Sequence, residues 1–339
     1  MTLPVRVACV GAGYFSQFHL GSWTRMNDVS LVGVADHNLK AAEATGLTAY
    51  SETGDMLREA RPDVLDIILP PSGQAATIEQ ALSSGIRTII CQKPFCTSLA
   101  EAEAMVEKAE RSGVTLIVHE NFRFMPWYRF INSALEAGAV GRLLNVTFRL
   151  RPGDGQGPDA YLARQPYFQH MPRFLVHETA VHWIDVFSYL LGAPQAVYAD
   201  LRRLNPAIAG EDAGTIIFNH PDDVSAIFDG NRLLDHASDN ARRTMGEALF
   251  EGTEATLSLF GDGRVERRAF GSVESQIVLA PDRWDGFGGD CVHAFQSHVL
   301  AFIQDGAPLE TEARIYLSVL RTRDAIYRSA DEGVRVALV

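Results

Sequence analysis

The amino-acid sequence predicts an α/β protein that begins with a doubly wound parallel sheet and continues as an α+β domain with a large, mostly antiparallel, open sheet. Three observations carry this prediction. Apolar strands alternate with helices over the first third of the chain, and a glycine-rich turn joins the first strand to the first helix. In the second half, short strands joined by short turns follow one another.

The elements of the first third follow one another in strand–helix order. Because the strands are continuous runs of Val, Ile and Leu, they fit a sheet that helices cover on both faces. The predicted strands span residues 5–10, 29–35, 47–50, 64–69, 86–91 and 114–118, and the predicted helices span 15–26, 41 onward, 54–60, 74–83 and 99–110.

The pattern changes near residue 120, and we expect two domains, 1–122 and 123–339. Helices are predicted at 126–137 and 174–191, each followed by a glycine, with a strand at 143–151 between them. Residues 152–172 are rich in Gly, Pro, polar and aromatic side chains and lack periodicity, which is typical of a functional loop. Several short strands follow between 195 and 278, and helices at 291–303 and 314–330 close the chain.

The composition narrows the classes of partner. The chain has 339 residues and a formal net charge of -12, and an acidic surface repels nucleic acids and anionic membranes. Because the N-terminal residues enter a strand directly, we expect no secretory leader, and no apolar run approaches the roughly 20 residues that span a bilayer. The cysteines have no metal-ligand spacing. We therefore expect a cytoplasmic protein with reduced thiols and without metal, nucleic acid or membrane.

A dinucleotide-binding turn is predicted at residues 11–16, Gly-Ala-Gly-Tyr-Phe-Ser, between the first strand and the first helix. Gly11 permits the tight turn, and Gly13, which lacks a Cβ, lets a pyrophosphate approach the backbone. The free N–H groups of the following helix N-terminus favour this anion. The motif predicts a Rossmann fold, and we expect Tyr14 and Phe15 to contact the cofactor.

Residues after the second and fourth strands extend this site. Asp36 stands where an acidic side chain hydrogen-bonds the adenosine ribose, and because its charge repels a 2′-phosphate, NAD is favoured over NADP. We expect contacts to the cofactor from His37 beside it, and from Leu69, Pro70 and Pro71 at the carboxyl edge of the sheet. The alternatives are a glycine turn that only packs, an Asp36 that is a surface strand end, and prolines that only end a strand.

Taken together, these motifs and several later ones resemble the Gfo/Idh/MocA oxidoreductases, relatives of glucose–fructose oxidoreductase and inositol dehydrogenase. Residues 91–94 look like the family's Glu-Lys-Pro motif, and residues 178–185 are similar to its Asp-x-Gly-x-His-x-x-Asp segment. The resemblance covers nearly the whole chain through VACVGAGYFSQFHL, the prolines at 70 and 71, CQKP, HENFRFMPWYR, GAVGRL, ETAVHWID and AIYRSADEG. The sequence departs from the family pattern at Gln74, Gln92, Glu178 and Ala180.

The residue types themselves suit hydride transfer. Oxidation of a secondary alcohol needs a base for the hydroxyl proton. Because the ordinary pKa of a histidine side chain lies near neutrality, His182 is the candidate general acid/base. Lys93, which follows the fifth strand, is the candidate cation for the developing alkoxide. Glu178 lies four residues before His182 on a predicted helix and shares its face, so we expect it to orient these groups or to bind substrate. The alternatives are a solvated lysine, a buried core histidine and a helix-capping glutamate.

Further candidates lie next to these motifs. The resemblance implies that Gln92, Lys93 and Asn121 contact the cofactor and that Arg123 contacts the substrate, although Arg123 also suits an ion pair with the acidic surface. His177 is either a substrate contact or a structural residue, and Asp185 is expected to be structural, paired with an arginine.

The long loop completes the predicted substrate site. Its polar groups and aromatic rings suit a polyhydroxylated ring, and Arg164 and Tyr167 are the candidates for contact with it. The alternatives are a solvated loop, a loop that packs on a neighbouring subunit, and an Arg164 that meets an acidic substrate.

The resemblance implies an NAD-dependent oxidoreductase that transfers a hydride between NAD and a secondary alcohol, or the anomeric carbon, of a sugar or cyclitol. We expect a homodimer or homotetramer associated through the C-terminal sheet, because such a sheet leaves apolar area for another subunit to cover. Two alternatives stay open: elimination or glycoside cleavage with recycled NAD, and a non-catalytic NAD(P)-sensing regulatory protein.

Overall fold

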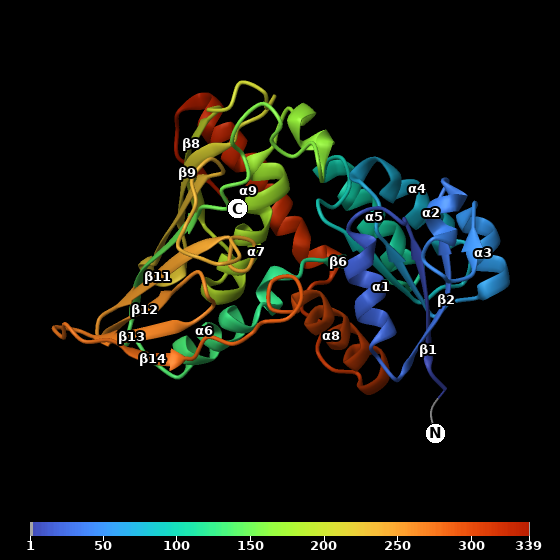
Figure 1. Cartoon of the computed structure of the whole chain (residues 1–339), viewed down its shortest axis with the longest axis horizontal. Coiled ribbons are helices and arrows are strands. Elements are labelled where there is room, and N and C mark those ends of the chain that lie inside the picture. The colour runs from blue at the N-terminus through green and yellow to red at the C-terminus, as the bar shows by residue number, and fades with distance from the viewer. Residues whose placement is uncertain (1–2, 339) are drawn as a thin grey trace. The chain divides into compact units, whose positions relative to one another are not determined.

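The computed structural model describes residues 3–338, and the chain forms two compact units (Figure 1). The first unit comprises the chain up to Glu120 together with Val292–Ser318, and the second comprises Asn121–Cys291 and the chain from Val319. The segment Val292–Ser318 thus packs with the first unit, although the sequence pattern assigns it to the second domain. Its contacts explain this: the Val118 N–H donates to the carbonyl of Thr311, and the His119 ring lies 4.3 Å from that of Phe295.

The first unit is built on a six-stranded parallel sheet in the order β3-β2-β1-β4-β5-β6. This is the strand order of doubly wound dinucleotide-binding folds, and it confirms the predicted Rossmann sheet. The strands are β1 (Val5–Val10), β2 (Val29–Ala35), β3 (Ala49–Tyr50), β4 (Val64–Ile67), β5 (Thr88–Gln92) and β6 (Thr115–His119).

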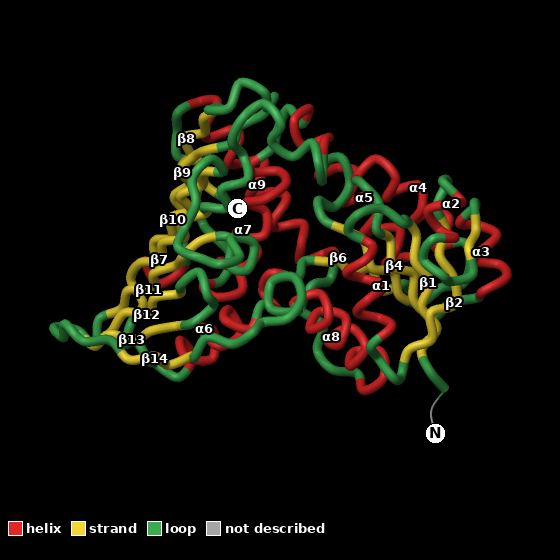
Figure 2. Tube along the Cα trace, viewed as in Figure 1, coloured by secondary structure: helices red, strands yellow, loops and turns green. Residues whose placement is uncertain are grey.

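Helices lie along this sheet, as the continuous apolar strands predict (Figure 2). The central strands β4 and β5 are buried along their whole length. The helices are α1 (Ser16–Thr24), α2 (Leu39–Glu43), α3 (Thr53–Ala60), α4 (Pro71–Leu82), α5 (Leu99–Arg111) and most of α8 (Cys291–Asp305). Strand order reverses between β1 and β4, so the glycine turn after β1 and the prolines after β4 both lie where such folds bind their ligands.

The second unit contains a nine-stranded sheet in the order β14-β13-β12-β11-β7-β10-β9-β8-β15. Strands β7 and β10 pair in parallel and the other neighbours run antiparallel, which confirms the predicted large, mostly antiparallel sheet. The strands are β7 (Leu143–Leu150), β8 (Ala196–Arg202), β9 (Ala213–Asn219), β10 (Ser225–Asn231), β11 (Gly246–Gly252), β12 (Ala255–Leu259), β13 (Val265–Ala269), β14 (Gln276–Leu279) and β15 (Val336–Ala337).

One face of this sheet carries the core of the second unit. Trp183 of α7 (Val181–Leu191) lies 4.2 Å from the ring of Phe148 on β7 and 5.6 Å from that of Phe228 on β10. Along β9 and β10 buried residues alternate with half-exposed ones, including Ile217 and Ile227 on the opposite face. Helix α6 (Pro126–Glu136) and most of α9 (Ala313–Glu332), which starts in the first unit, complete the second unit.

The predicted helix at 174–191 is wrong in its first part. Residues Leu175–Ala180 form a π-helix, η3, in which the N–H of Val181 donates to the carbonyl of Val176, and the α-helix starts only at Val181. Glu211 stabilises the start of this turn, because its backbone and side-chain oxygens accept from the N–H groups of Leu175 and Val176 at 2.9 and 3.0 Å. A π-turn widens the helix by one residue, and such turns are frequent at functional sites.

The described residues also form short 3-10 helices that the sequence pattern does not predict: η1 (Phe122–Phe124), η2 (Pro166–His170) and η4 (Pro221–Asp223). Within residues 3–338, none of the helices combines the length and the apolar character needed to cross a membrane.

Candidate active site

The two glycines of the first turn have different surroundings. Gly11 has a φ of 101°, and a Cβ there would lie 2.5 Å from the carbonyl oxygen of Ile68, so the fold itself requires glycine at this position. Gly13 is exposed, and a Cβ there would meet no heavy atom within 4 Å. The first glycine thus packs the turn against β4, whereas the second leaves open the backbone that a pyrophosphate would approach.

This contrast yields a matched pair of variants. Gly13→Ala should fold with a Tm within about 2 °C of the wild type, because its methyl group meets nothing in the protein. It should nevertheless weaken NAD binding about tenfold or more, ~1.4 kcal/mol, because the methyl group lies on the surface that the pyrophosphate needs. Gly11→Ala, the control, should lower the Tm. Calorimetry and NAD titration measure both, and Gly13→Ala with undiminished NAD affinity would refute this assignment.

Asp36 holds the glycine turn. Its Oδ2 accepts from the N–H of Ala12 and its Oδ1 from the N–H of Asn38, both at 2.8 Å. His37, whose side chain is 96% exposed, places its Nδ1 3.3 Å from the same carboxylate. Since an ionised carboxylate has about four acceptor positions, Asp36 can bind ribose hydroxyls while it holds the turn. Its structural role and its predicted cofactor role are therefore compatible.

Gln74 connects the ends of β4 and β5. Its buried Nε2 lies within hydrogen-bond distance of the carbonyl oxygens of Leu69, Gln92 and Pro94, at 3.0, 2.9 and 3.1 Å, and its Oε1 accepts from the N–H of Cys96 at 2.7 Å. One amide thus ties the segment after β4 to the segment that carries Lys93, in which the Lys93-Pro94 bond is cis. The departure from the family pattern at residue 74 forms a structural cross-link beside the predicted cofactor site.

Lys93 is attached to a buried polar chain. Gln92 accepts from the Lys93 backbone N–H through its Oε1 at 2.8 Å, and its Nε2 lies 3.1 Å from Nε2 of His19. Because the Gln92 oxygen is engaged with Lys93, its nitrogen is the donor and His19 Nε2 the acceptor. The His19 proton therefore lies on Nδ1 and is donated to Asp66 at 2.7 Å, where Trp23 also donates at 2.8 Å. His19 and Asp66 are both fully buried.

This series of hydrogen bonds, from Asp66 through His19 and Gln92 to the Lys93 backbone, was not predicted from the sequence. Its visible signals are a carboxylate inside the apolar strand β4 and an imidazole in α1, and neither has a spacing that indicates a site. A buried carboxylate must be paired, and here the pairing leads through an imidazole and an amide to the predicted catalytic lysine.

In the second unit, His182 lies at the first turn of α7 and is 5% exposed. The Phe122 ring lies flat against the imidazole, with centroids 3.6 Å apart and planes within 4°. Trp183, the next residue, donates from Nε1 to the hydroxyl of Tyr128 at 3.1 Å. The imidazole thus has a fixed plane, which a general acid/base needs for directed proton transfer.

Arg123 and Asn121, predicted to contact substrate and cofactor, both bond to side chains of the second unit. The Arg123 guanidinium forms a buried two-point ion pair with Asp185 of α7 at 2.8 and 2.5 Å. Asn121 lies with its Nδ2 3.1 Å from the sulfur of Cys291. Asp185 is therefore paired with an arginine, as predicted, and this pair fixes η1, including Phe122, to the helix that carries His182.

His177 and Glu178 lie on the π-turn η3. Arg323 places its Nη1 3.3 Å from Nδ1 of His177, and since arginine only donates, the His177 proton lies on Nε2. The N–H of His177 donates to the Tyr327 hydroxyl at 3.1 Å. Glu178 accepts from the Thr179 hydroxyl at 2.7 Å and is half-buried. His177 thus offers a donor and Glu178 an acceptor, the two functions that recognition of hydroxyl groups requires.

The predicted substrate loop folds onto η3. Arg164 donates to Asp154 at 3.1 Å, and the same carboxylate oxygen accepts from Arg232 at 3.0 Å. Burial alone would raise the pKa of Asp154, but the two guanidiniums outweigh it and lower the pKa below its usual range. Tyr167 is 56% exposed, and its hydroxyl accepts from Gln165 at 3.1 Å. Arg232 lies outside every motif and was missed in the sequence.

The structure therefore gathers the predicted residues in two sets, one in each unit. The predicted cofactor residues, apart from Asn121, lie at the carboxyl ends of β1, β2, β4 and β5 or directly after them. The predicted substrate residues other than Lys93 lie on η1, η3, α7 and the loop. Within residues 3–338, no group of three or more His, Cys, Asp and Glu side chains is placed to hold a metal ion. The Rossmann sheet with its glycine turn is typical of a dinucleotide-binding protein, and the residue types gathered in the second unit suit an oxidoreductase.

Comparisons with known proteins agree with this class. A family model described as an oxidoreductase family with an NAD-binding Rossmann fold matches residues 5–120, and the GFO/IDH/MocA C-terminal domain matches residues 128–258. D-apiose dehydrogenase of Paraburkholderia graminis is 32% identical over 98% of this chain and 89% of its own length. The inositol 2-dehydrogenase of Rhizobium meliloti is 24% identical over 99% of this chain and 100% of its own length.

Solved structures show the same fold. An oxidoreductase from Agrobacterium radiobacter, crystallised with NAD+, L-tartaric acid and magnesium, is 26% identical and superimposes with a TM-score of 0.88 over 98% of both chains. Levoglucosan dehydrogenase in complex with NADH and levoglucosan reaches a TM-score of 0.83 at 20% identity, over 98% of this chain and 99% of its own. The chain therefore belongs to the Gfo/Idh/MocA family and is an NAD-dependent oxidoreductase, as predicted.

Proposed function

We propose that this protein oxidises a secondary alcohol, or the anomeric carbon, of a neutral sugar or cyclitol with NAD. The observation that carries the proposal is the full-length similarity to D-apiose dehydrogenase, at 32% identity. The charges of the second unit support a neutral substrate. Arg164 and Arg232 share Asp154, Arg232 also lies 3.9 Å from Glu178, and Arg123 is paired with Asp185. Three guanidiniums thus face three carboxylates of the protein.

In the proposed reaction, His182 takes the proton of the substrate hydroxyl while the C–H bond breaks and the carbonyl forms. When bound, NAD supplies the acceptor for the hydride. The Lys93 ammonium stabilises the alkoxide that develops as the proton leaves. Glu178 accepts a hydrogen bond from a second hydroxyl, and His177, Arg164 and Tyr167 provide further polar contacts that select the sugar.

The first unit, in this proposal, holds NAD through Gly11, Gly13, Asp36 and the prolines after β4, with Gln92 at the nicotinamide end. Asn121, which belongs to the second unit, is proposed as a further contact to the cofactor. The second unit selects the substrate and carries subunit association through the half-exposed face of its sheet, where Ile217 and Ile227 lie. We place the enzyme in the cytoplasm as a homodimer or homotetramer.

A substrate screen tests the function. Neutral sugars including D-apiose, cyclitols and sugar acids are incubated with NAD or NADP, and NADH absorbance is followed. The expected result is NADH formation with a neutral sugar or cyclitol, NAD being preferred because Asp36 repels a 2′-phosphate. Turnover confined to sugar acids would refute the neutral substrate, and substrate consumption without net NADH would replace oxidation with cleavage on recycled NAD.

A further inference from the structure

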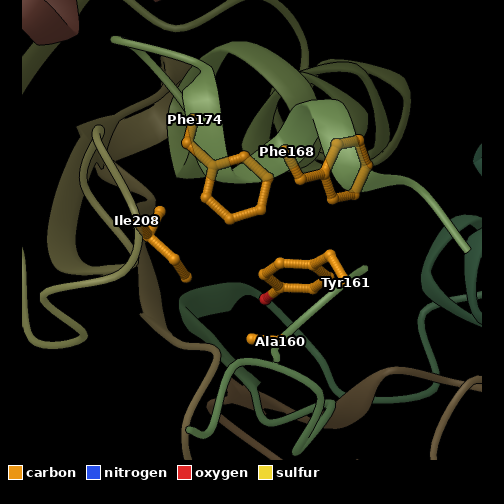
Figure 3. Packing of buried hydrophobic residues seen from close by; sticks show 5 residues of the cluster. All are labelled: Ala160, Tyr161, Phe168, Phe174 and Ile208. Carbon is orange, nitrogen blue, oxygen red and sulfur yellow. The ribbon is translucent and has the colours of Figure 1, made fainter. Parts of the chain in front are cut away.

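Arg232, directly after β10, is a buried arginine that the proposed mechanism does not yet use. It is 2% exposed, and its Cζ lies 5.1, 5.8 and 4.7 Å from the ring centroids of Tyr161, Phe168 and Phe174. Figure 3 shows these rings facing one another in a cluster completed by Ala160 and Ile208. A charge buried among apolar groups is costly unless every donor finds a partner, so its partners carry information.

The three nitrogens of this guanidinium bond to two different segments. Nε donates to the Tyr161 hydroxyl at 2.7 Å and Nη2 to Asp154 at 3.0 Å, and both of these partners belong to the loop. Nη1 donates to the hydroxyl of Thr179 on η3. Thr179 in turn donates to Glu178 at 2.7 Å, and the Glu178 carboxylate lies 3.9 Å from Nη1. The planar guanidinium of arginine has five N–H donors in fixed directions, so it can bind these three partners at once. The compact ammonium group of a lysine cannot reproduce this arrangement.

Other contacts hold the loop together within itself and against the segment around Ile208. The Nε2 of Gln169 lies 2.8 Å from the carbonyl oxygens of Pro158 and Ala160, and the N–H of Ala209 donates to the carbonyl of Gln169 at 2.9 Å. The loop contains one short helical turn, η2, and its backbone is anchored by Asn205, whose Nδ2 lies 2.8 Å from the carbonyl oxygens of Gly155 and Gly157. None of these contacts reaches η3. Through Thr179, Arg232 therefore joins the loop that carries the candidate substrate residues to Glu178.

We propose that Arg232 is a positioning residue for substrate binding: it holds residues 154–168 against η3 and so sets the arrangement of Arg164, Tyr167 and Glu178. This inference rests on the proposed function, because it assigns those three residues to the substrate. It follows that substrate affinity depends on a side chain that itself makes no contact with substrate. The affinity for NAD should not depend on Arg232, because the proposed NAD contacts lie mainly in the first unit.

The test compares Arg232→Lys and Arg232→Met with Arg151→Met. Arg151 is also a buried arginine that directly follows a strand, β7, of the nine-stranded sheet. Its guanidinium, however, donates hydrogen bonds to the carbonyl oxygen of Leu150 and to the backbone and side chain of Asp229. Both Arg232 variants should raise the KM for the sugar about tenfold or more, ~1.4 kcal/mol, and leave the KM for NAD unchanged. Arg151→Met should lower the Tm and leave both KM values unchanged.

Hydrogen exchange provides a second readout that needs no substrate. Amides of residues 154–168 should exchange at least about tenfold faster in Arg232→Lys than in the wild type. If Arg232→Met does not fold, Tyr161→Phe and Thr179→Val each remove one partner of the guanidinium and should raise the sugar KM several-fold. An unchanged sugar KM in a folded Arg232→Lys enzyme would overturn the proposal. If the wild type oxidises no sugar or cyclitol, the proposed function is refuted. The positioning role of Arg232 can still be tested in that case, because unchanged hydrogen exchange of residues 154–168 in Arg232→Lys would refute it.

Discussion

Replacing His182 with alanine is expected to lower kcat by about 10²–10⁴-fold, with NAD binding retained. The reason is that no other group is assigned to take the hydroxyl proton, and without a base the alkoxide must form unaided. Lys93→Ala should also lower kcat, because the charge that stabilises the alkoxide is lost. Steady-state kinetics with the sugar found in the screen, together with NAD titration, measure both variants.

Phe122 provides the control for His182. Phe122→Leu keeps an apolar side chain at this position but removes the ring that lies flat against the imidazole. We expect this variant to lose less than His182→Ala, about tenfold in kcat, because the base remains but its plane is no longer fixed. Turnover that is unchanged in both His182→Ala and Lys93→Ala would end the assignment of the catalytic residues and leave a nucleotide-binding protein of another purpose.

The parallel sheet and the glycine turn can both be predicted from the sequence alone. A strand that is buried on both faces must be a continuous apolar run. The turn that follows β1 needs glycine at residue 11, because a Cβ there would collide with the carbonyl oxygen of Ile68. Although Gly11 and Ile68 are far apart in the sequence, each constraint leaves a local mark, an apolar run or a glycine, so both are visible in a short stretch of sequence. The pairing of Asp185 with an arginine is also predictable, because a carboxylate on an otherwise apolar helix needs a cation.

The missed features depend on contacts between distant segments. The π-turn at η3 exists because Glu211 and Tyr327, far from it in sequence, satisfy N–H groups of that turn. Arg232 is one of many arginines in the chain, and nothing in its neighbourhood marks it as buried. The return of Val292–Ser318 to the first unit likewise follows from tertiary packing, which helical periodicity cannot reveal.

The second large effect on kcat is expected from Gln92, whose side-chain oxygen accepts a hydrogen bond from the backbone N–H of Lys93. Gln92→Leu should lower kcat about 10-fold to 100-fold, because the backbone N–H of Lys93 loses its acceptor and His19 loses its donor. Gln92→Glu keeps an acceptor for the Lys93 N–H. We therefore expect Gln92→Glu to retain more activity than Gln92→Leu. Initial rates and thermal unfolding are measured for each variant.

A double-mutant cycle separates this positioning role from general stability. In the Lys93→Ala background, Gln92→Leu should have no further effect on the residual kcat, because the group through which it acts is gone. Trp23→Phe is the matched control: it removes a donor to Asp66 but leaves the path from His19 through Gln92 to Lys93 in place. It should lower the Tm with little change in kcat. Equal losses from Gln92→Leu in both backgrounds would show that Gln92 supports the fold rather than the lysine, since a structural defect lowers activity whether or not Lys93 is present.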